Sequence, residues 1–259
     1  MGASRLQLIR PDWPVPANIR SLVTMRTGGA SQREFASMNL GGHVGDEAGS
    51  VETNRRLLAA EANLPVDRFH WLEQVHGVDV AMLNDVKPAQ VPRADAAFTS
   101  QLQQACCILT ADCLPVLFAA SDGSSVAAAH AGWRGLAAGV LENTAKCFNE
   151  PTELLVWLGP AISQAAFEVG QEVMDAFVAQ DSASAACFTP SSPEAGKWRA
   201  DLYALARRRL HSLGITQVFG GDCCTYTDSD RFFSYRRDGV TGRMASVIWL
   251  DSSPENIRA

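Results

Sequence analysis

The stretch ACCILTADCLPVLFAASDGSSVAAAHA, residues 105–131, carries the strongest fold signal of this chain. It contains three apolar runs of small or β-branched residues, at 105–110, 116–120 and 126–129. Pro115 and a turn around Gly123 separate the runs. Short continuous apolar runs between turn residues are typical of strands that are covered on both faces of a sheet. The stretch therefore predicts buried strands at the centre of the fold.

On both sides of this stretch, the sequence predicts strands and helices that do not alternate regularly. Further strands are expected at residues 19–26, 69–75, 78–83, 154–158, 216–219, 232–235 and 244–250. Helices are expected at residues 46–62, with Asp46 as the N-cap candidate, and at 135–148, 171–179 and 201–212. Residues 182–196 are small, polar and contain proline, so an exposed loop is expected there. This mixture predicts an α/β (α+β) fold with a mixed sheet, or two stacked sheets, and helices outside.

The composition limits the class of protein. A chain of 259 residues with 47% hydrophobic residues can bury one large core, so residues 1–259 are expected to form a single domain. The net charge of −6 and the pI near 5.4 argue against a surface that neutralises nucleic-acid phosphates or anionic lipid. The composition favours a small-molecule partner.

The cysteines favour a reducing compartment. There are seven, an odd number, and Cys106-Cys107 and Cys223-Cys224 are adjacent pairs, whereas disulfide frameworks more often show an even, spaced set. The first twelve residues lack a signal-peptide core, and no run approaches ~18 apolar residues. We therefore expect a cytoplasmic protein without a membrane segment. Neighbours on a strand point to opposite faces, so neither cysteine pair is expected to chelate one ion, and both are predicted to be mostly core residues.

Two histidines and one cysteine stand at the ends of apolar runs. His76, Cys113 and His130 offer nitrogen and sulfur ligands that suit Zn²⁺, and three protein ligands leave a fourth position for water or substrate. An alternative interpretation uses the same atoms without metal. Cys113 is then a nucleophile and His130 its base, with Asp112 or Asp95 orienting the imidazole.

Arginines close to these residues indicate an anion site. Arg134 follows Gly132 at the start of a predicted helix, where backbone N–H groups and a guanidinium favour an anion close to the metal. Arg236 lies in a second polar cluster that ends at a glycine turn, and its planar fork suits a phosphate or a carboxylate.

Five ordered motifs together resemble one known family. They are Gln74-Val75-His76-Gly77, Thr110-Ala111-Asp112-Cys113-Leu114-Pro115-Val116, His130-Ala131-Gly132-Trp133-Arg134-Gly135, Gly159-Pro160-Ala161-Ile162 and Phe233-Ser234-Tyr235-Arg236-Arg237-Asp238-Gly239. The chain closely resembles the YfiH-type laccase-domain proteins, long called polyphenol oxidases. Asn39-Leu40, His43-Val44-Gly45-Asp46 and Asn54-Arg55 fit the N-terminal pattern of that family, so the resemblance covers nearly the whole chain.

The resemblance implies a four-layer α/β/β/α sandwich with mixed sheets, similar to the cysteine hydrolases of the cytotoxic necrotizing factor type. It implies that His76, Cys113 and His130 hold zinc. The implied activity is that of a purine nucleoside phosphorylase, in which phosphate displaces the purine of adenosine, inosine, guanosine or methylthioadenosine and ribose 1-phosphate forms. Adenosine deamination is associated with the same site. Some bacterial members of the family resemble peptidoglycan editing factors that remove L-Ser from a muramic acid precursor, which is the alternative function.

Phosphorolysis requires groups that bind the phosphate and groups that face the nucleoside. Arg134, Arg55 and Arg236 are the phosphate-binding candidates because guanidinium groups form bidentate contacts with phosphate. Motif position also assigns Asn39, His43 and Gln74 to the substrate site. Asp112 and Glu73 are the nearby acids, and of their two roles, donating a proton to the purine or orienting a ligating histidine, the second is favoured.

Two other interpretations remain at this stage. A copper oxidase is the older hypothesis, but a multicopper site needs many more histidines than the five of this chain. A non-catalytic binding protein with a structural zinc ion is the other. It would require a fourth protein ligand, and no clear candidate for one is present. Neither pattern nor composition predicts the oligomeric state.

Overall fold

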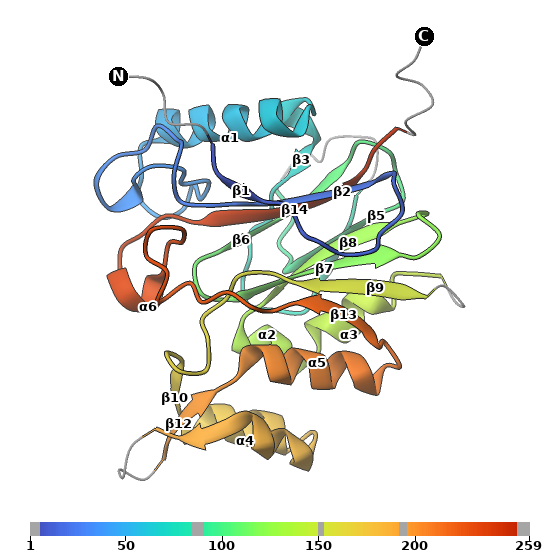
Figure 1. Ribbon diagram of the computed structural model, residues 1–259, viewed down its shortest axis with the longest axis vertical. Helices are drawn as coiled ribbons and strands as arrows, with labels where there is room; N and C mark the ends of the chain where they lie inside the picture. Colours follow the sequence, from blue (N-terminus) through green and yellow to red (C-terminus); the bar gives the residue numbers. More distant parts are fainter. Residues whose placement is uncertain (1–5, 84–90, 150–152, 192–195, 253–259) are drawn as a thin grey trace.

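Two stacked β-sheets with helices on both outer faces form the body of the molecule (Figure 1). The computed structural model describes residues 6–83, 91–149, 153–191 and 196–252. From top to bottom in Figure 1 the layers are helix α1, a first sheet, a second sheet, and a layer with α2, α3 and α5. The α/β/β/α architecture implied by the family resemblance is confirmed.

Within the described ranges the strands form three sheets. The first has the order β1 (Leu8–Ile9), β2 (Ile19–Thr24), β14 (Met244–Leu250), β6 (Ala105–Thr110) and β3 (Phe69–His70). The second has the order β13 (Gln217–Gly220), β9 (Leu154–Leu158), β7 (Leu114–Ala120), β8 (Val126–Ala131), β5 (Ala96–Thr99) and β4 (Val80–Met82). A small third sheet, β10 (Glu168–Gly170), β12 (Lys197–Ala200) and β11 (Phe188–Pro190), lies at the far end of the molecule with α4 (Figure 1).

The helices are short apart from α1 and α5. They are α1 (Ala48–Ala62), α2 (Trp133–Ala138), α3 (Val140–Ala145), α4 (Gln171–Val178), α5 (Leu202–Ser212) and α6 (Tyr235–Asp238). The 3-10 helices are η1 (Arg33–Phe35), η2 (Val66–Arg68) and η3 (Ser182–Cys187). Within the described ranges, every helix is too short or too polar to span a lipid bilayer.

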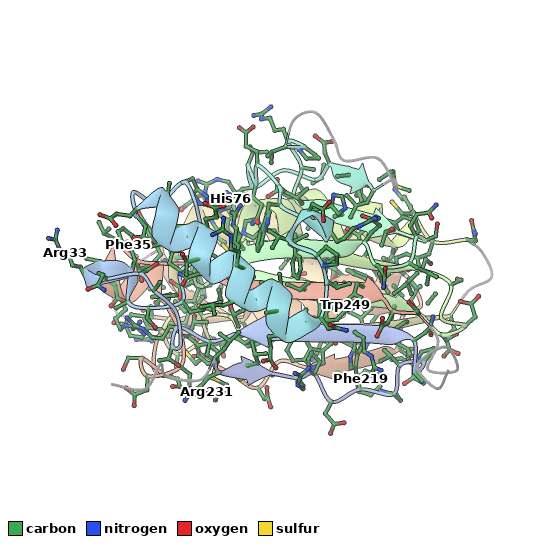
Figure 2. The ribbon with its side chains drawn as sticks, turned by 90° about the horizontal axis from the view of Figure 1, so that it is seen from above. Arg33, Phe35, His76, Phe219, Arg231 and Trp249 are labelled. Atoms are coloured by element: carbon green, nitrogen blue, oxygen red, sulfur yellow. The ribbon has the colours of Figure 1, made fainter. Side chains whose placement is uncertain are left out.

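Strand alternation builds separate hydrophobic cores on the two faces of each sheet. In β6, Cys106 packs between the two sheets, whereas Cys107 packs on the α1 side, so their predicted opposite orientation is confirmed. Trp249 of β14 belongs to the same cluster as Leu58 of α1 and lies beneath that helix (Figure 2). Because both faces of the central strands are covered, the sequences of these strands are continuous apolar runs.

The chain changes sheets at the point that matters most for function. β6 belongs to the first sheet and β7 to the second, and residues 111–113 connect them. Cys113 therefore lies at the shared edge of the two sheets, directly before β7. His130 lies near the end of β8, opposite Pro115 of β7, at this same edge.

Two predicted elements are wrong. Residues 232–235 do not form a strand: Phe232 and Phe233 are both buried, and Ser234 caps α6 by accepting a hydrogen bond from the backbone N–H of Arg237. The helix expected at 135–148 is divided into α2 and α3 because Gly139 adopts φ 104°, a left-handed conformation that ends the first helix.

Other boundaries differ from the sequence prediction. β7 begins at Leu114 and includes Pro115, because proline is tolerated close to the first residue of a strand. The strand expected at 69–75 ends at His70, and Glu47 rather than Asp46 is the N-cap of α1. The loop expected at 182–196 contains η3 and β11, and its residues 192–195 lie outside the described ranges. Residues 1–5 of the N-terminal segment, where no signal peptide is expected, also lie outside them.

A candidate metal centre

His76, Cys113 and His130 come together at the shared edge of the two sheets. One ligand atom from each residue lies within 4.8 Å of the others. His76 Nε2 and Cys113 Sγ are 3.9 Å apart, and the two imidazole rings are edge to face with centroids 4.7 Å apart. The three side chains predicted from strand-end positions thus converge on one point.

Asp95 holds both histidines in place. Its fully buried carboxylate accepts hydrogen bonds from His130 Nδ1 at 2.8 Å and from the backbone N–H groups of Val75, His76 and Gly77 at 3.1, 2.9 and 2.6 Å. These backbone contacts stabilise a tight turn in which His76 has φ 60°. Because Nδ1 of His130 is occupied, its Nε2 is left to face the cluster.

The three side chains of the cluster differ in solvent exposure, and their charges shift one another's pKa values. His130 is buried, Cys113 is half-buried and His76, labelled in Figure 2, is exposed, so the cluster is open to solvent on the His76 side. Burial raises the pKa of the Cys113 thiol, but His130 and His76 outweigh this and bring that pKa to about 6. Burial lowers the pKa of His130, whereas Cys113 and Asp95 raise it to about 9. Cys113 is therefore a thiolate at neutral pH, the form that binds metals and attacks electrophiles.

The donor set fits a zinc ion. Zinc takes thiolate and imidazole ligands at about 2.0–2.3 Å in a tetrahedron, which separates the ligand atoms by roughly 3.3–3.8 Å. The 3.9 Å between His76 Nε2 and Cys113 Sγ is close to that spacing. Gly132 keeps the space open, because a Cβ at this position would lie 2.9 Å from His76 Cδ2 and 3.1 Å from Cys113 Sγ. Within the described residues this group offers three protein ligands.

Asp112 does not orient a ligating histidine, so the favoured sequence interpretation of this residue is wrong. Its carboxylate accepts hydrogen bonds from Thr225 Oγ1 at 2.6 Å and from the backbone N–H of Arg236 at 2.7 Å. Asp112 therefore ties α6 to the edge of the site. Glu73 is exposed, and within the described ranges it makes no hydrogen bond to either ligating histidine. Asp95, the other carboxylate considered for this role, performs it.

The amide groups of Gln74 and Asn39 are engaged with the protein itself. Gln74 accepts from the backbone N–H of Leu109 and donates to its carbonyl, both at 2.8 Å. Asn39 is fully buried, and its side chain bonds Gly41, Asp46 and the backbone N–H of Arg243. Both amides are thus hydrogen-bonded within the protein, and their assignment to the substrate site stays a prediction.

The predicted anion-binding residues occupy different positions. Arg134 is exposed in the first turn of α2 and covers the ring of Trp133 at 4.4 Å. Arg236 is exposed, and its Nη1 donates to the carbonyl of Glu168 at 2.8 Å. Arg55 is half-buried, with its guanidinium carbon 4.2 Å from the ring centroid of Trp71. Its Nη2 donates to the carbonyl of Leu40, in the loop that carries His43. Arg243, a residue outside the predicted set, lies beside that same loop.

Fold and site together define a mixed α/β protein with a candidate His-Cys-His metal centre at a sheet edge. Residues 20–251 match the family model described as multi-copper polyphenol oxidoreductase laccase. The chain therefore belongs to this laccase-like family, as the resemblance predicted.

Individual relatives extend this result over nearly the full length. The purine nucleoside phosphorylase YfiH of Escherichia coli (strain K12) is 52% identical over 245 residues, which cover 94% of this chain and 99% of that protein. A purine nucleoside phosphorylase of Pseudomonas aeruginosa is 53% identical over 243 residues, or 93% of this chain and 98% of that protein. The crystal structure of a Neisseria meningitidis protein of the DUF152 family has a TM-score of 0.89 and 48% identity, covering 96% of this chain and 100% of that one.

Proposed function

We propose that this protein is a zinc-dependent purine nucleoside phosphorylase. The substrates are adenosine, inosine, guanosine and methylthioadenosine, and the co-substrate is phosphate. The observation that carries the proposal is the cluster of His76, Cys113 and His130. It occurs in a chain whose relatives, with 52–53% sequence identity over more than nine-tenths of its length, are named purine nucleoside phosphorylases. Adenosine deamination is a second activity proposed for this site.

The reaction defines what the protein must supply. The bond between ribose C1′ and the purine nitrogen breaks, a phosphate oxygen forms a bond to C1′, and the purine leaves with the electron pair and takes up a proton. The transition state carries positive charge on the ribose, so an anion fixed next to C1′ stabilises it. We assign phosphate binding to the guanidinium groups around the cluster, with Arg134, Arg55 and Arg236 as the candidates.

The metal ligands divide their work between binding and orientation. His76, Cys113 and His130 would hold zinc, which supplies a Lewis acid for an oxygen of the phosphate or ribose. Asp95 fixes the tautomer of His130 by accepting from Nδ1, so that the Nε2 lone pair stays directed at the centre. Asp112 acts as a positioning residue that holds the backbone of Arg236 near the cluster.

A cysteine hydrolase is the second candidate function, and the electrostatics of the cluster favour it. Cys113, His130 and Asp95 have the order of a nucleophile, a base and an orienting carboxylate, and the pKa of Cys113 is about 6. In this case the thiolate attacks an amide carbonyl, such as that joining L-Ser to a muramic acid precursor, the C–N bond breaks, and the released amine takes the proton from His130. Water, deprotonated by the now neutral His130, then cleaves the thioester, which releases the acid and restores the Cys113 thiolate and the protonated His130.

Purine release measured with defined metal content tests the proposal. Purified protein is incubated with inosine or adenosine, with and without phosphate, and free purine, ribose 1-phosphate and ammonia are quantified. Cys113→Ser removes the thiolate. Cys147→Ser is the matched control, because Cys147 is also half-buried but follows α3, where its thiol donates a hydrogen bond to the Asn143 carbonyl and packs against the core. We expect phosphate-dependent purine release by the wild type and by Cys147→Ser, and loss of both zinc and activity in Cys113→Ser.

Two outcomes contradict the proposal. Zinc-loaded protein that releases no purine from any of the four nucleosides eliminates the phosphorylase function. Turnover of a seryl-muramyl amide that survives complete zinc removal but is abolished by alkylation of Cys113 establishes the cysteine hydrolase instead.

A further inference from the structure

Two arginines from distant parts of the chain flank one short loop. Arg55 of α1 donates Nε and Nη2 to the carbonyl of Leu40 at 3.3 and 3.0 Å. Arg243 accepts from the backbone N–H of Leu40 at 3.1 Å, and its own N–H donates to Asn39 Oδ1 at 2.9 Å. A Cβ on Gly41 would lie 2.8 Å from Arg243 Cγ, so the loop packs directly on this side chain. Both arginine side chains therefore contact residues 40–42, and the charges of both act on His43 in the same loop.

The same loop is close to the metal centre. β14 pairs antiparallel with β6, with Met244 opposite Thr110, so Arg243 lies one residue beyond the ladder and opposite Ala111. Cys113 is only two residues further along the chain. Burial lowers the pKa of Arg243 while the charges of Cys113 and Asp112 raise it, which agrees with their proximity. Arg243 is therefore close to the cluster, and Arg55 is joined to it through the loop that both side chains contact.

Neither guanidinium has a carboxylate partner among the described residues. The side-chain hydrogen bonds of Arg55 go to one carbonyl, and those of Arg243 go from Nη1 to the carbonyls of Thr241 and Gly242 at 2.8 and 3.1 Å. Both arginines are half-buried, and burial lowers the pKa of each. His43 adds no negative charge; partial burial, Arg243 and Arg55 lower its pKa. Partly desolvated cations are normally paired, so this arrangement lacks an anion.

We propose that Arg243 and Arg55 together bind the phosphate co-substrate next to the His-Cys-His cluster. This inference rests on the phosphorylase function proposed above and adds Arg243, which sequence motifs did not select. Two guanidinium groups next to the same short loop can contact different oxygens of one phosphate, and forked, charge-assisted contacts are among the strongest that a protein offers an anion. Arg236, whose Nη1 is engaged with Glu168, becomes the weaker candidate.

Calorimetric titration with inorganic phosphate tests the site directly on the zinc-loaded protein. Arg243→Gln removes the charge, and Arg243→Lys retains it without the fork. Arg56→Gln is the matched control, because Arg56 neighbours Arg55 on α1 but is exposed and paired with Glu52. We expect Arg243→Gln to weaken phosphate binding by about 10- to 100-fold, Arg243→Lys to weaken it less, and Arg56→Gln to leave it unchanged. Phosphate binding by Arg243→Gln within twofold of the wild type overturns the inference.

Kinetics separate a binding role from a structural one. We expect Arg243→Gln to raise KM for phosphate by the same factor, with KM for inosine and the melting temperature close to those of the wild type. Equal damage to both KM values together with a lower melting temperature overturns the assignment. The assignment is also overturned if Arg243→Gln weakens the binding of adenosine 5′-monophosphate but leaves the binding of inorganic phosphate unchanged.

A measurement on the wild type covers the case in which the variants do not fold. Phosphate should slow phenylglyoxal modification of Arg243 and Arg55, mapped by mass spectrometry, and leave Arg56 unprotected. Equal modification with and without phosphate contradicts the proposal. Failure of the phosphorylase function and failure of the phosphate site give different results. If phosphate binding depends on Arg243 but no purine is released, only the phosphorylase function is eliminated. If purine release depends on phosphate and Arg243→Gln leaves KM for phosphate unaltered, only this phosphate site is eliminated.

Discussion

Replacing Asp95 by asparagine is the most informative single change at the metal centre. The substitution preserves size and shape but exchanges one carboxylate oxygen for an NH₂ group. Oδ1 accepts from His76 N and His130 Nδ1, and Oδ2 accepts from Val75 N and Gly77 N. Whichever way the amide is oriented, two of the four donors lose their acceptor and face a second donor.

The magnitude follows from the number of bonds lost. A hydrogen bond to a charged group contributes about 1.5–3 kcal/mol, so losing two should reduce the free energy of unfolding of the zinc-free protein by about 3–6 kcal/mol. The released turn at His76 and the freed ring of His130 also loosen two of the three metal ligands. Loss of such supporting hydrogen bonds typically weakens metal binding by about 10- to 100-fold.

Urea unfolding followed by tryptophan fluorescence in the presence of a chelator measures the first effect, and competition with a chromophoric zinc chelator measures the second. Asp67→Asn is the control, because Asp67 is exposed and its carboxylate has no hydrogen bond in the described part of the chain. It should change stability by less than about 0.5 kcal/mol. The reasoning is refuted if Asp95→Asn unfolds within about 1 kcal/mol of the wild type and binds zinc equally well.

Three further changes test the fold. Phe118→Ala should lower the free energy of unfolding by about 3–5 kcal/mol in a urea titration, because the ring is fully buried, whereas Leu102→Ala at a 55% exposed position should have little effect. Asn54→Ala removes four hydrogen bonds that hold residues 30–39 and should cost about 2–4 kcal/mol in the same assay; an effect below about 1 kcal/mol would contradict this. A hydrogen bond from Arg208 holds the pKa of Asp181 below its ordinary value of about 3.9, so the stabilisation by the ionised carboxylate is present above that pH and lost as the pH falls through the native pKa. Asp181→Asn should therefore lower the melting temperature at pH 7, and the difference from the wild type should shrink below about pH 4; a difference independent of pH would rule this out.

The buried central strands could be predicted because they leave a local pattern, whereas the order of the four layers was implied by the family resemblance. The runs at 105–110, 116–120 and 126–129 are apolar throughout because both faces of each strand are covered, and all three became strands. The sequence did not show that the first of these runs belongs to one sheet and the other two to a second. That division depends on pairing β6 with β14, which lies more than a hundred residues away in the chain.

The sequence by itself determined the identity of the candidate metal ligands, because His76, Cys113 and His130 stand at the ends of apolar runs and within recognisable motifs. Only the tertiary structure decided which groups support them. Asp95 rather than Asp112 holds His130. Likewise, only the fold brings Arg243 next to residues 39–41, about 200 residues earlier in the chain, where Arg55 also bonds. The residue type of a metal ligand and its neighbours in a motif can be read directly from the sequence. The partner of a buried donor or cation is whichever group the packed chain brings within about 3 Å, and no local pattern carries that information.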